Sequence, residues 1–501
     1  MWRNAGMKFK YLLLILLITS FSTLSGCRTG IWGNEGVKPM AEQATVPAPL
    51  VVDGFRTSYA DVVDKTSPAV VQIEARQQAR QIQVPRGRNP GDDLLRQFGF
   101  PDQNQRPQIE RGVGSGVIVS ADGSILTNHH VVEGANKITI TTNDNKTYDA
   151  RIVGSDQPSD LAVLKIEATD LPFLVLGNSD NVRVGDIVLA IGNPLGIGQT
   201  VTAGIISAKG RRTGLSDGSF EDFLQTDAPI NRGNSGGALV NLAGELIGIN
   251  SQILSGGPSG GSIGIGFSIP SNMAKSVMDQ LLQDGKVRRG MLGINIQNIT
   301  DDTAKALDLK DRSGILVSNV KSGSAADKAG IKRGDIITAI NGDKIEDSNV
   351  LRNKVAGTLP GTEIKLTVVR DGESRELTAT LDEFELSDSQ RPNPDRESPG
   401  DGVAPQNQGG RLGLSLEPLT PQTARQLGID PGEGGLAVTD VDPSGPAAEA
   451  GISRSDVILE INRKPIATMD DVRTTLGGAG DRPVLLLITR GGQTVYVTVK
   501  P

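Results

Sequence analysis

The chain has 501 residues and a formal net charge of −7 without any dense block of lysine and arginine, so the charge pattern does not support nucleic-acid binding. Hydrophobic residues make up 37% and aromatic residues only 3%, and the 62 glycines favour a turn-rich, mainly β protein. Cys27 is the single cysteine and His129 and His130 are the only histidines, which excludes an intrachain disulfide and leaves too few ligands for a usual zinc site. No metal or organic cofactor is implied.

Residues 1–26 have the pattern of a bacterial export signal. A short basic segment ending at Lys10 precedes the apolar run Tyr11–Ile18, which is far shorter than the ~20 residues that a membrane-spanning helix needs. The following Leu24-Ser25-Gly26-Cys27 resembles a bacterial lipobox, which implies cleavage before Cys27, lipid on that cysteine and anchoring to a membrane. An ordinary secretory signal with an incidental cysteine is the alternative.

Two polar segments of the N-terminal part are expected to lack a packed core. Residues 27–50 carry scattered proline and alanine, which suits a tether, and residues 79–111 are rich in Arg, Gln, Pro and Gly and predict a long loop.

By similarity to enterobacterial lipoproteins, Arg28 in place of aspartate after the cysteine favours the outer membrane.

From residue 51 onwards the chain shows the short strands and glycine turns that are typical of β-barrels. Val117–Val119 and Ile125–Thr127 flank an Asp-Gly pair and predict a hairpin. Ser271 is expected to cap a helix that ends at Gly285. Further strands are predicted at Ala69–Ile73, Ile187–Ile191, Thr202–Ile206, Ala238–Val240 and Leu246–Ile249. The buried face of the helix is predicted to consist of Met273, Ala274, Val277, Met278, Leu281 and Leu282.

The C-terminal part contains an internal repeat. Val320–Ile345 aligns without gaps to Val441–Ile466, and residues 385–409 between the copies hold almost nothing to bury. Two copies separated by 121 positions are too few and too far apart for a solenoid, so they predict two homologous modules joined by a flexible linker.

Three motifs in the first large domain place a histidine, an aspartate and a serine in the chain order of chymotrypsin. They are Thr127–Val132, Ser159–Leu164 and Gly233–Gly237, which contain His130, Asp160 and Ser235. A serine hydroxyl needs a base, an imidazole titrates near neutral pH, and a carboxylate holds that imidazole in the correct tautomer. The backbone of Gly233, Asn234 and Ser235 predicts an oxyanion hole.

Each motif alone also fits a simple turn, a strand cap or a core histidine, but the three in order favour a catalytic triad. Together with Gly114–Val117, Gln225–Asn231 and Gly264–Pro270 they resemble the HtrA (Deg-type, Do-like) periplasmic serine endoproteases, and the resemblance covers residues 51–501. It implies His130 as the base, Asp160 as the orienting carboxylate and Ser235 as the nucleophile. The family usually has asparagine where this chain has His129, which we interpret as a neighbouring support residue.

The resemblance also implies the architecture: a chymotrypsin-like double β-barrel followed by two α+β PDZ domains. Combined with the signal, tether and linker patterns above, the expected boundaries are 1–26 for the signal peptide, 27–50 for the tether, 51–286 for the peptidase domain, 287–383 for the first PDZ domain, 384–409 for the linker and 410–501 for the second PDZ domain. Specificity-pocket walls are expected at Ile230, Ile265, Gly266 and Phe267, and carboxylate-binding loops at Met291, Leu292, Gly293 and Ile294 and at Leu412, Gly413 and Leu414.

The apolar pocket walls predict cleavage after small aliphatic residues such as Val, Ile or Ala. The expected function is therefore degradation of unfolded or damaged proteins in the bacterial envelope, with PDZ domains that bind peptide C-termini. An ATP-independent holdase and a PDZ adaptor with little proteolysis are the alternatives. The resemblance implies homotrimers or larger homo-oligomers in the periplasm.

Overall fold

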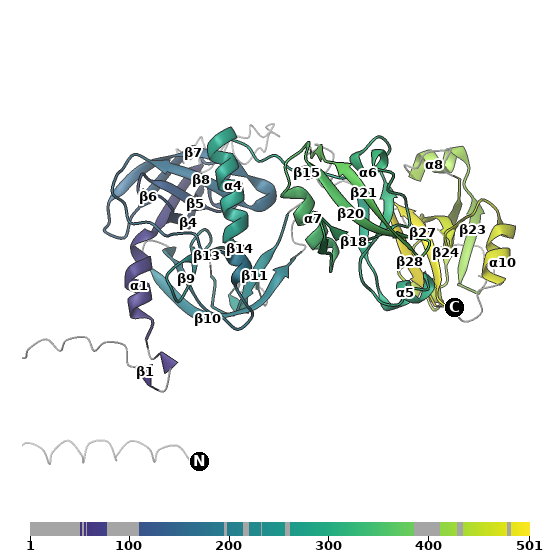
Figure 1. The fold of residues 1–501 in the computed structure, drawn as a ribbon, viewed down its shortest axis with the longest axis horizontal. Helices are drawn as coiled ribbons and strands as arrows, with labels where there is room; N and C mark the ends of the chain where they lie inside the picture. The colour runs from purple at the N-terminus through teal and green to yellow at the C-terminus, as the bar shows by residue number, and fades with distance from the viewer. Residues whose placement is uncertain are drawn as a thin grey trace, which may run out of the picture. The chain divides into compact units, whose positions relative to one another are not determined.

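The computed structural model describes residues 51–52, 55–56, 58–77, 110–194, 198–213, 220–231, 233–255, 261–384, 411–427, 434–477 and 482–500 (Figure 1). The expected signal peptide, Cys27 and almost all of the expected tether, long loop and linker lie outside these residues. The chain forms two compact units, Met1–Thr57 and Ser58–Pro501, so the expected boundary at 51 falls inside the first unit. Of that unit the structure describes a hairpin of β1 (Val51–Val52) and β2 (Phe55–Arg56).

The peptidase part begins with a closed six-stranded barrel that contains the predicted hairpin. The strands follow the order β3-β4-β5-β8-β7-β6, and Val117 pairs with Leu126 across the hairpin. The helix α1 (Ala60–Thr66) precedes the barrel, and α3 (His129–Val132) directly follows its third strand. The strands are β3 (Val70–Gln77), β4 (Glu110–Ile118), β5 (Ser124–Thr127), β6 (Lys137–Thr141), β7 (Thr147–Asp156) and β8 (Leu161–Ile166), with short 3-10 turns η1 (Ser67–Ala69) and η2 (Gln157–Ser159).

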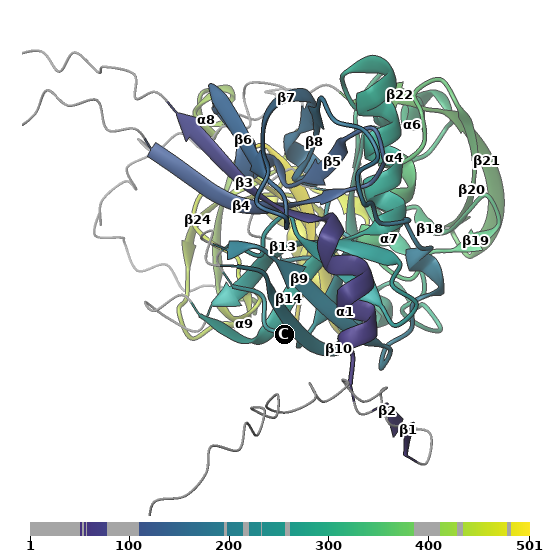
Figure 2. The same ribbon diagram turned by 90° about the vertical axis from the view of Figure 1, so that its left-hand side faces the viewer.

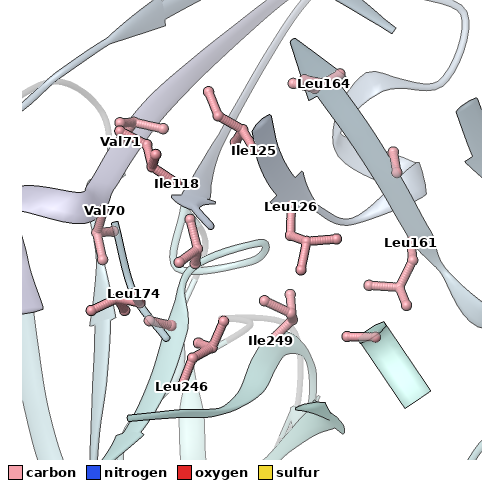
Figure 3. Packing of buried hydrophobic residues seen from close by; sticks show 14 of the residues in the cluster. Val70, Val71, Ile118, Ile125, Leu126, Leu161, Leu164, Leu174, Leu246 and Ile249 are labelled. Atoms are coloured by element: carbon pink, nitrogen blue, oxygen red, sulfur yellow. The ribbon is translucent and has the colours of Figure 1, made fainter. Parts of the chain in front are cut away.

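A second closed barrel follows in the order β10-β11-β14-β13-β12-β9. Every strand predicted in this region is present, although β10 and β13 are longer than expected. The strands are β9 (Ile187–Gly192), β10 (Thr200–Arg211), β11 (Phe223–Thr226), β12 (Ala238–Asn241), β13 (Leu246–Ser255) and β14 (Ser262–Pro270), with η3 (Ser179–Asn181) before the first of them. Residues from both barrels share one apolar core, in which Leu126 and Leu161 of the first barrel lie near Leu246 and Ile249 of the second (Figure 3).

The helix α4 (Ser271–Asp284) lies against the barrels (Figure 2), and its residues Ala274, Val277 and Leu281 belong to the shared core. Two details of the sequence prediction are wrong. Ser271 is the first helical residue, and its hydroxyl donates to the carbonyl of Gly177 at 2.6 Å instead of capping the helix. Leu282, expected on the buried face, is 47% exposed because the contact with the barrels covers a narrower stripe of the helix than the apolar pattern suggests.

Two sheets of matching topology form the C-terminal modules, as the repeat predicts. The first contains β16 (Ile294–Asn298), β17 (Ile315–Val320), β18 (Ile336–Ile340), β19 (Asp343–Lys344), β20 (Glu363–Arg370) and β21 (Glu373–Thr380), with α5 (Asp301–Ala306), α6 (Ala325–Lys328), α7 (Ser348–Ala356) and the pair β15 (Gly290–Met291) and β22 (Asp382–Glu383). The second contains β23 (Leu414–Pro418), β24 (Leu436–Val441), β25 (Val457–Ile461), β26 (Lys464–Pro465), β27 (Val484–Arg490) and β28 (Gln493–Val499), with α8 (Pro421–Leu427), α9 (Pro446–Glu449) and α10 (Met469–Gly477).

The two modules bury apolar residues against each other in addition to their own cores. Leu316 and Ile336 of the first join Val457 and Leu487 of the second in one buried cluster. Tyr496 lies in the same cluster, where burial, followed by the nearby negative charge of a glutamate, raises its pKa to about 12. Within the described part of the chain, no helix is long and apolar enough to cross a membrane.

The aligned aspartates of the two repeats make the same buried ion pair. Asp335 binds the guanidinium of Arg370 at 2.6 and 2.7 Å, and Asp456 binds that of Arg490 at 2.6 Å through both oxygens. Each arginine also donates to a glycine carbonyl of its own module at 2.7 Å. The side chains of both aspartates are only 1% exposed, so in each module the arginine compensates a carboxylate that is almost fully removed from water.

Replacing Arg370 by methionine should destabilise the first module strongly, because it leaves the carboxylate of Asp335 buried without a counter-charge. We expect a loss of about 3–5 kcal/mol in the free energy of unfolding, measured by urea denaturation of the mature chain. Arg375 is the matched control, because it forms only an exposed ion pair with Glu373, and Arg375→Met should cost less than about 1 kcal/mol. Equal losses for the two variants would contradict the assignment.

Candidate active site

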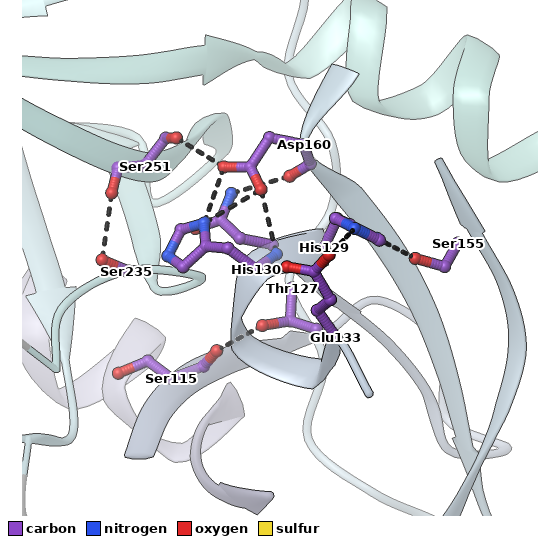
Figure 4. Close-up of polar contacts among 10 residues, drawn as sticks. Ser115, Thr127, His129, His130, Glu133, Ser155, Asp160, Ser235 and Ser251 are labelled. Atoms are coloured by element: carbon purple, nitrogen blue, oxygen red, sulfur yellow. Dashed lines mark hydrogen bonds and ion pairs between the residues drawn. The ribbon is translucent and has the colours of Figure 1, made fainter. Parts of the chain in front are cut away.

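The structure brings the side chains of His130 and Asp160 into direct contact (Figure 4). The imidazole Nδ1 lies 2.9 Å from each carboxylate oxygen of Asp160, and the backbone N–H of His130 donates to Oδ1 at 3.1 Å. Asp160 has a left-handed backbone with φ of 54°, immediately before β8, and its carbonyl accepts from Nδ2 of Asn128 at 3.0 Å. The carboxylate therefore holds the proton on Nδ1 and leaves Nε2 with a free lone pair, as a general base requires.

Ser235 lies next to this pair and is joined to it through Ser251 on β13. The hydroxyl of Ser235 donates to the backbone carbonyl of Ser251 at 3.0 Å, and the hydroxyl of Ser251 donates to Oδ2 of Asp160 at 2.8 Å (Figure 4). Among the described residues, the Ser235 hydroxyl makes no hydrogen bond to His130. Sequence reasoning did not find Ser251, because a lone serine within a strand has no local pattern that distinguishes it.

His129 points away from the serine and contacts a different part of the first barrel. Its Nδ1 lies 2.6 Å from the hydroxyl of Ser155, and its Nε2 lies 3.7 Å from a carboxylate oxygen of Glu133. The side chain is 18% exposed, compared with 47% for His130. Adjacent residues on α3 thus present two imidazoles to different partners, and His130 is the one that contacts Asp160.

The loop that carries Ser235 is held by contacts that only glycine permits. Gly236 has a φ of 81°, and a Cβ at this position would overlap the carbonyl oxygen of Ser115. The N–H of Asn234 donates to the carbonyl of Asn231 at 3.0 Å, so this N–H of the expected oxyanion hole is already engaged. The N–H groups of Gly233 and Ser235 donate to no other group among the described residues.

Ser115 on β4 connects this loop to the first barrel. Its N–H donates to the carbonyl of Ser235 at 2.8 Å, and its hydroxyl donates to the carbonyl of Gly233 at 2.6 Å. The same hydroxyl accepts from the N–H of Asn193 at 2.8 Å. Ser115 was noted in the sequence only as part of a Gly-Ser-Gly motif, because its role depends on partners that are more than 70 residues away.

Of the expected specificity residues, Ile265, Gly266 and Phe267 lie on β14 of the second barrel, and Ile230 lies in the loop that follows β11. Ile230 is 1% exposed, and a Cβ at Gly266 would lie 2.9 Å from its Cδ1. Ile265 is partly buried against the core, and Phe267, 4% exposed, has its ring centroid 5.6 Å from that of Phe223. A separate cavity of about 320 Å³ lies beside His130, Asp160 and Ser251, but the expected specificity residues do not line it.

Both expected carboxylate-binding loops have the same geometry. In the first PDZ domain the carbonyl of Leu292 accepts from Ala326 at 2.9 Å, and that of Gly293 accepts from Lys321 at 2.9 Å. Gly293 has a φ of 76°, and a Cβ there would overlap Ser324. In the second domain the carbonyls of Leu412 and Gly413 accept from Ala447 at 3.1 Å and Asp442 at 2.8 Å. Met291 and Ile294 flank the first loop, and Leu414, 8% exposed, begins the strand after the second.

Comparison with known proteins agrees with this geometry. Residues 114–249 match the trypsin-like peptidase domain, and residues 290–381 and 437–490 each match a PDZ domain. A probable DegP-like periplasmic serine endoprotease of Chlamydia pneumoniae is 41% identical, with 93% of this chain and 94% of the relative covered. The periplasmic pH-dependent serine endoprotease DegQ of Escherichia coli is 40% identical, with 91% and 94% covered.

Solved structures extend the likeness to three dimensions. The HtrA-type protease AlgW with a tripeptide is 42% identical, has a TM-score of 0.54, and covers 66% of this chain and 99% of its own. The same protease with a decapeptide has a TM-score of 0.53. With a double-barrel peptidase domain, two PDZ domains and about 40% identity over most of its length, the chain belongs to the HtrA-type family of periplasmic serine endoproteases.

Proposed function

We propose that the chain hydrolyses peptide bonds of unfolded or damaged proteins with Ser235 as nucleophile, His130 as general base and Asp160 as the carboxylate that orients it. The contact of Nδ1 of His130 with both oxygens of Asp160 at 2.9 Å, beside Ser235, carries this proposal. In the proposed reaction the Ser235 hydroxyl leaves the carbonyl of Ser251 and turns to Nε2 of His130. The catalytic hydrogen bond between a serine and its histidine base is often long or absent before substrate binds.

The steps then follow from the groups in place. Nε2 of His130 takes the proton of Ser235 as the serine oxygen attacks the peptide carbonyl, and the N–H groups of Gly233 and Ser235 stabilise the oxyanion. His130 next protonates the leaving amine. A water molecule, deprotonated by the same imidazole, hydrolyses the acyl-enzyme and releases the second product. Asp160 remains ionised and stabilises the positive charge on the ring.

Substrate choice is proposed from the apolar residues around the site. Ile230 and the segment Ile265–Phe267 would accept a small aliphatic side chain before the cleaved bond. The carboxylate-binding loop of the first PDZ domain would bind peptide C-termini. It directly precedes β16, and an extended peptide can pair with that strand as an additional strand of the sheet. The second PDZ domain carries the same loop geometry and is assigned the same role.

We also propose the cellular arrangement. The relatives are named periplasmic, which supports a periplasmic location. Lipid on Cys27 would tether the enzyme to the envelope, with the outer membrane favoured by Arg28, and the peptidase domains would form homotrimers or larger assemblies. Mass spectrometry of the processed N-terminus and light scattering of the solubilised protein test these two points.

Replacing Ser235 by alanine should abolish digestion of unfolded β-casein by the mature chain. Loss of the nucleophile costs about 10⁶-fold in turnover, so the variant should leave casein intact. Digestion is followed by gel electrophoresis under matched conditions. A variant that still digests casein would refute Ser235 as the nucleophile. A folded wild type that digests nothing but suppresses aggregation would favour the holdase alternative.

The two histidines should differ sharply when each is replaced by asparagine. His130→Asn removes the base and should lower kcat by at least about 10⁴-fold. His129→Asn keeps a side chain that can bond Ser155, so we expect less than about a tenfold change. Steady-state cleavage of a quenched fluorescent peptide measures both. Comparable losses for the two variants would mean that the base has been assigned to the wrong ring.

Ser115→Ala should impair catalysis although Ser115 does not touch substrate. The change leaves the Asn193 N–H and the Gly233 carbonyl without their hydroxyl partner, which costs about 1–3 kcal/mol in positioning the loop, or about 10- to 100-fold in kcat. KM should change little, because the oxyanion forms only in the transition state. Ser276→Ala, at an exposed site on α4, is the matched control and should behave as wild type. An unchanged kcat for Ser115→Ala would exclude this positioning role.

A further inference from the structure

The first PDZ domain has a groove between β16 and α7, which run in opposite directions. At one end the N–H of Gly290 donates to the carbonyl of Thr358 at 2.9 Å, just beyond the end of α7. At the other end the N–H of Ser348 donates to Oδ1 of Asn298 at 2.8 Å. The groove belongs to a cavity of about 1080 Å³. The carboxylate-binding loop therefore lies at the C-terminal end of α7, and an added peptide strand would run along the helix.

The sides of this cavity are cationic. Its charged lining residues are Arg212, Lys321, Arg352 and Arg490, and no aspartate or glutamate lines it. Arg490 is already neutralised by its two bonds to Asp456. Lys321 is exposed and lies beside the carboxylate-binding loop, where its N–H donates to the carbonyl of Gly293. Lys321 at the carboxylate-binding loop, and Arg212 and Arg352 along the groove, are thus the charges that form no ion pair with a described residue.

The positive charges of these two arginines repel each other. Neither forms an ion pair with any described residue. Arg352 is half-buried, and its pKa is lowered first by desolvation and then by the charge of Arg212, against a weaker opposing effect of Glu221. Arg212 is exposed, and two like charges of which one is partly desolvated remain unfavourable until an anion binds between them. The pair therefore has the electrostatic character of an empty carboxylate site.

The loop that carries Arg212 is fixed against α7. Nδ2 of Asn349 and Nδ2 of Asn353, both on the helix, donate to the carbonyl of Glu221 at 2.8 and 2.9 Å. The carboxylate of Glu221 in turn accepts from the N–H of Thr213 at 2.6 Å. These bonds hold Thr213, the neighbour of Arg212, near α7, and Arg212 and Arg352 line the same cavity.

The spacing along α7 indicates which peptide residue reaches the arginines. Val355 and Ala356 lie near the carboxylate-binding loop, and a Cβ at Gly290 would lie 2.8 Å from the carbonyl of Val355. Arg352 precedes them by three and four residues, which at ~1.5 Å per helical residue is about 5–6 Å. An extended peptide covers that distance in about two residues, at ~3.3 Å each, and residues two apart face the same side.

We propose that the first PDZ domain selects peptide C-termini with Asp or Glu two residues before the last, whose carboxylate is bound by Arg352 and Arg212. The inference rests on the proposed binding of C-termini by this domain and adds the chemical class of the ligand. The last side chain would lie over Val355, and the acidic side chain would face the two guanidinium groups. Charge-assisted hydrogen bonds from arginine are among the strongest that a protein surface offers a carboxylate.

The test uses the mature chain with Ser235→Ala, so that no peptide is cut, and fluorescence anisotropy with labelled decapeptides. Three peptides end in valine and differ only at the third position from the end, with Glu, Gln or Lys there. The Glu peptide should bind about tenfold more tightly than the Gln peptide at low salt, and the preference should shrink as salt is added. Arg352→Gln and Arg212→Gln should each reduce the preference to less than about twofold.

The controls separate this inference from the proteolytic function. Arg375→Gln, at an exposed site outside the cavity, should leave the preference intact, and Arg352→Glu should invert it in favour of the Lys peptide. Equal binding of the Glu and Gln peptides by the unaltered groove overturns the inference, as does a preference that survives Arg352→Gln. If the Ser235→Ala chain binds none of the peptides while the chain with Ser235 intact still digests casein, the inference is overturned and the proteolytic function stands. A clear preference for the Glu peptide without any casein digestion supports the inference and contradicts only the proposed proteolysis.

Discussion

The arrangement of the proposed active site depends on one buried residue, Ser115, whose N–H and hydroxyl bind segments of the second barrel and whose carbonyl binds the first. It is 0% exposed, and its N–H and hydroxyl bind the carbonyls of Ser235 and Gly233 at 2.8 and 2.6 Å. Its own carbonyl accepts from the hydroxyl of Thr127 at 2.7 Å, at the end of the strand that leads to His130. One residue of the first barrel thus connects the strand that leads to His130, the proposed base, with the loop that carries Ser235, the proposed nucleophile. Because this loop comes from the second barrel, the apolar core that both barrels share keeps these bonds free of competing water.

A second chain of contacts connects the aspartate to the segment that leads into the first PDZ domain. Asp156 accepts from the N–H of Ser159 at 3.0 Å and thereby fixes the short turn that ends at Asp160. The same carboxylate binds Arg289 at 2.5 and 2.8 Å, with both side chains less than 9% exposed, and the guanidinium lies 4.8 Å from the ring centroid of Phe220. Breaking a buried pair of this kind by removing one partner costs about 3–5 kcal/mol. The start of the first PDZ domain is therefore connected to the turn that ends at Asp160, the proposed catalytic aspartate.

The elements that have a local sequence signal could be predicted from the sequence. The hairpin at Asp122-Gly123, the strands of both barrels, the helix ending at Gly285 and the repeated modules all follow from short patterns of apolar residues, glycine and alignment. Sequence reasoning failed where a side chain's role depends on distant partners. Ser271 looks like a helix cap, but its hydroxyl is taken by Gly177, and nothing near Arg212 indicates that Arg352, 140 positions later, will lie beside it. Burial of an aspartate in each repeat was likewise not foreseeable, since the arginine that compensates it lies 35 residues away in the first copy and 34 in the second.

In the proposed reaction, the hydroxyl of Ser235 has to move only a little before the chemistry begins. It donates to the carbonyl of Ser251 at 3.0 Å, whereas His130 and Asp160 are already in contact at 2.9 Å. Exchange of one hydrogen-bond acceptor for another requires rotation about a single side-chain bond and a net cost of about 0.5–1.5 kcal/mol at most, or about a tenfold effect on rate. That is small beside the ~10⁶-fold loss of turnover expected when a nucleophilic serine is removed. Because Ser251 also donates to Asp160, the carboxylate keeps its second partner throughout this rotation, and the imidazole stays in the tautomer that accepts the proton.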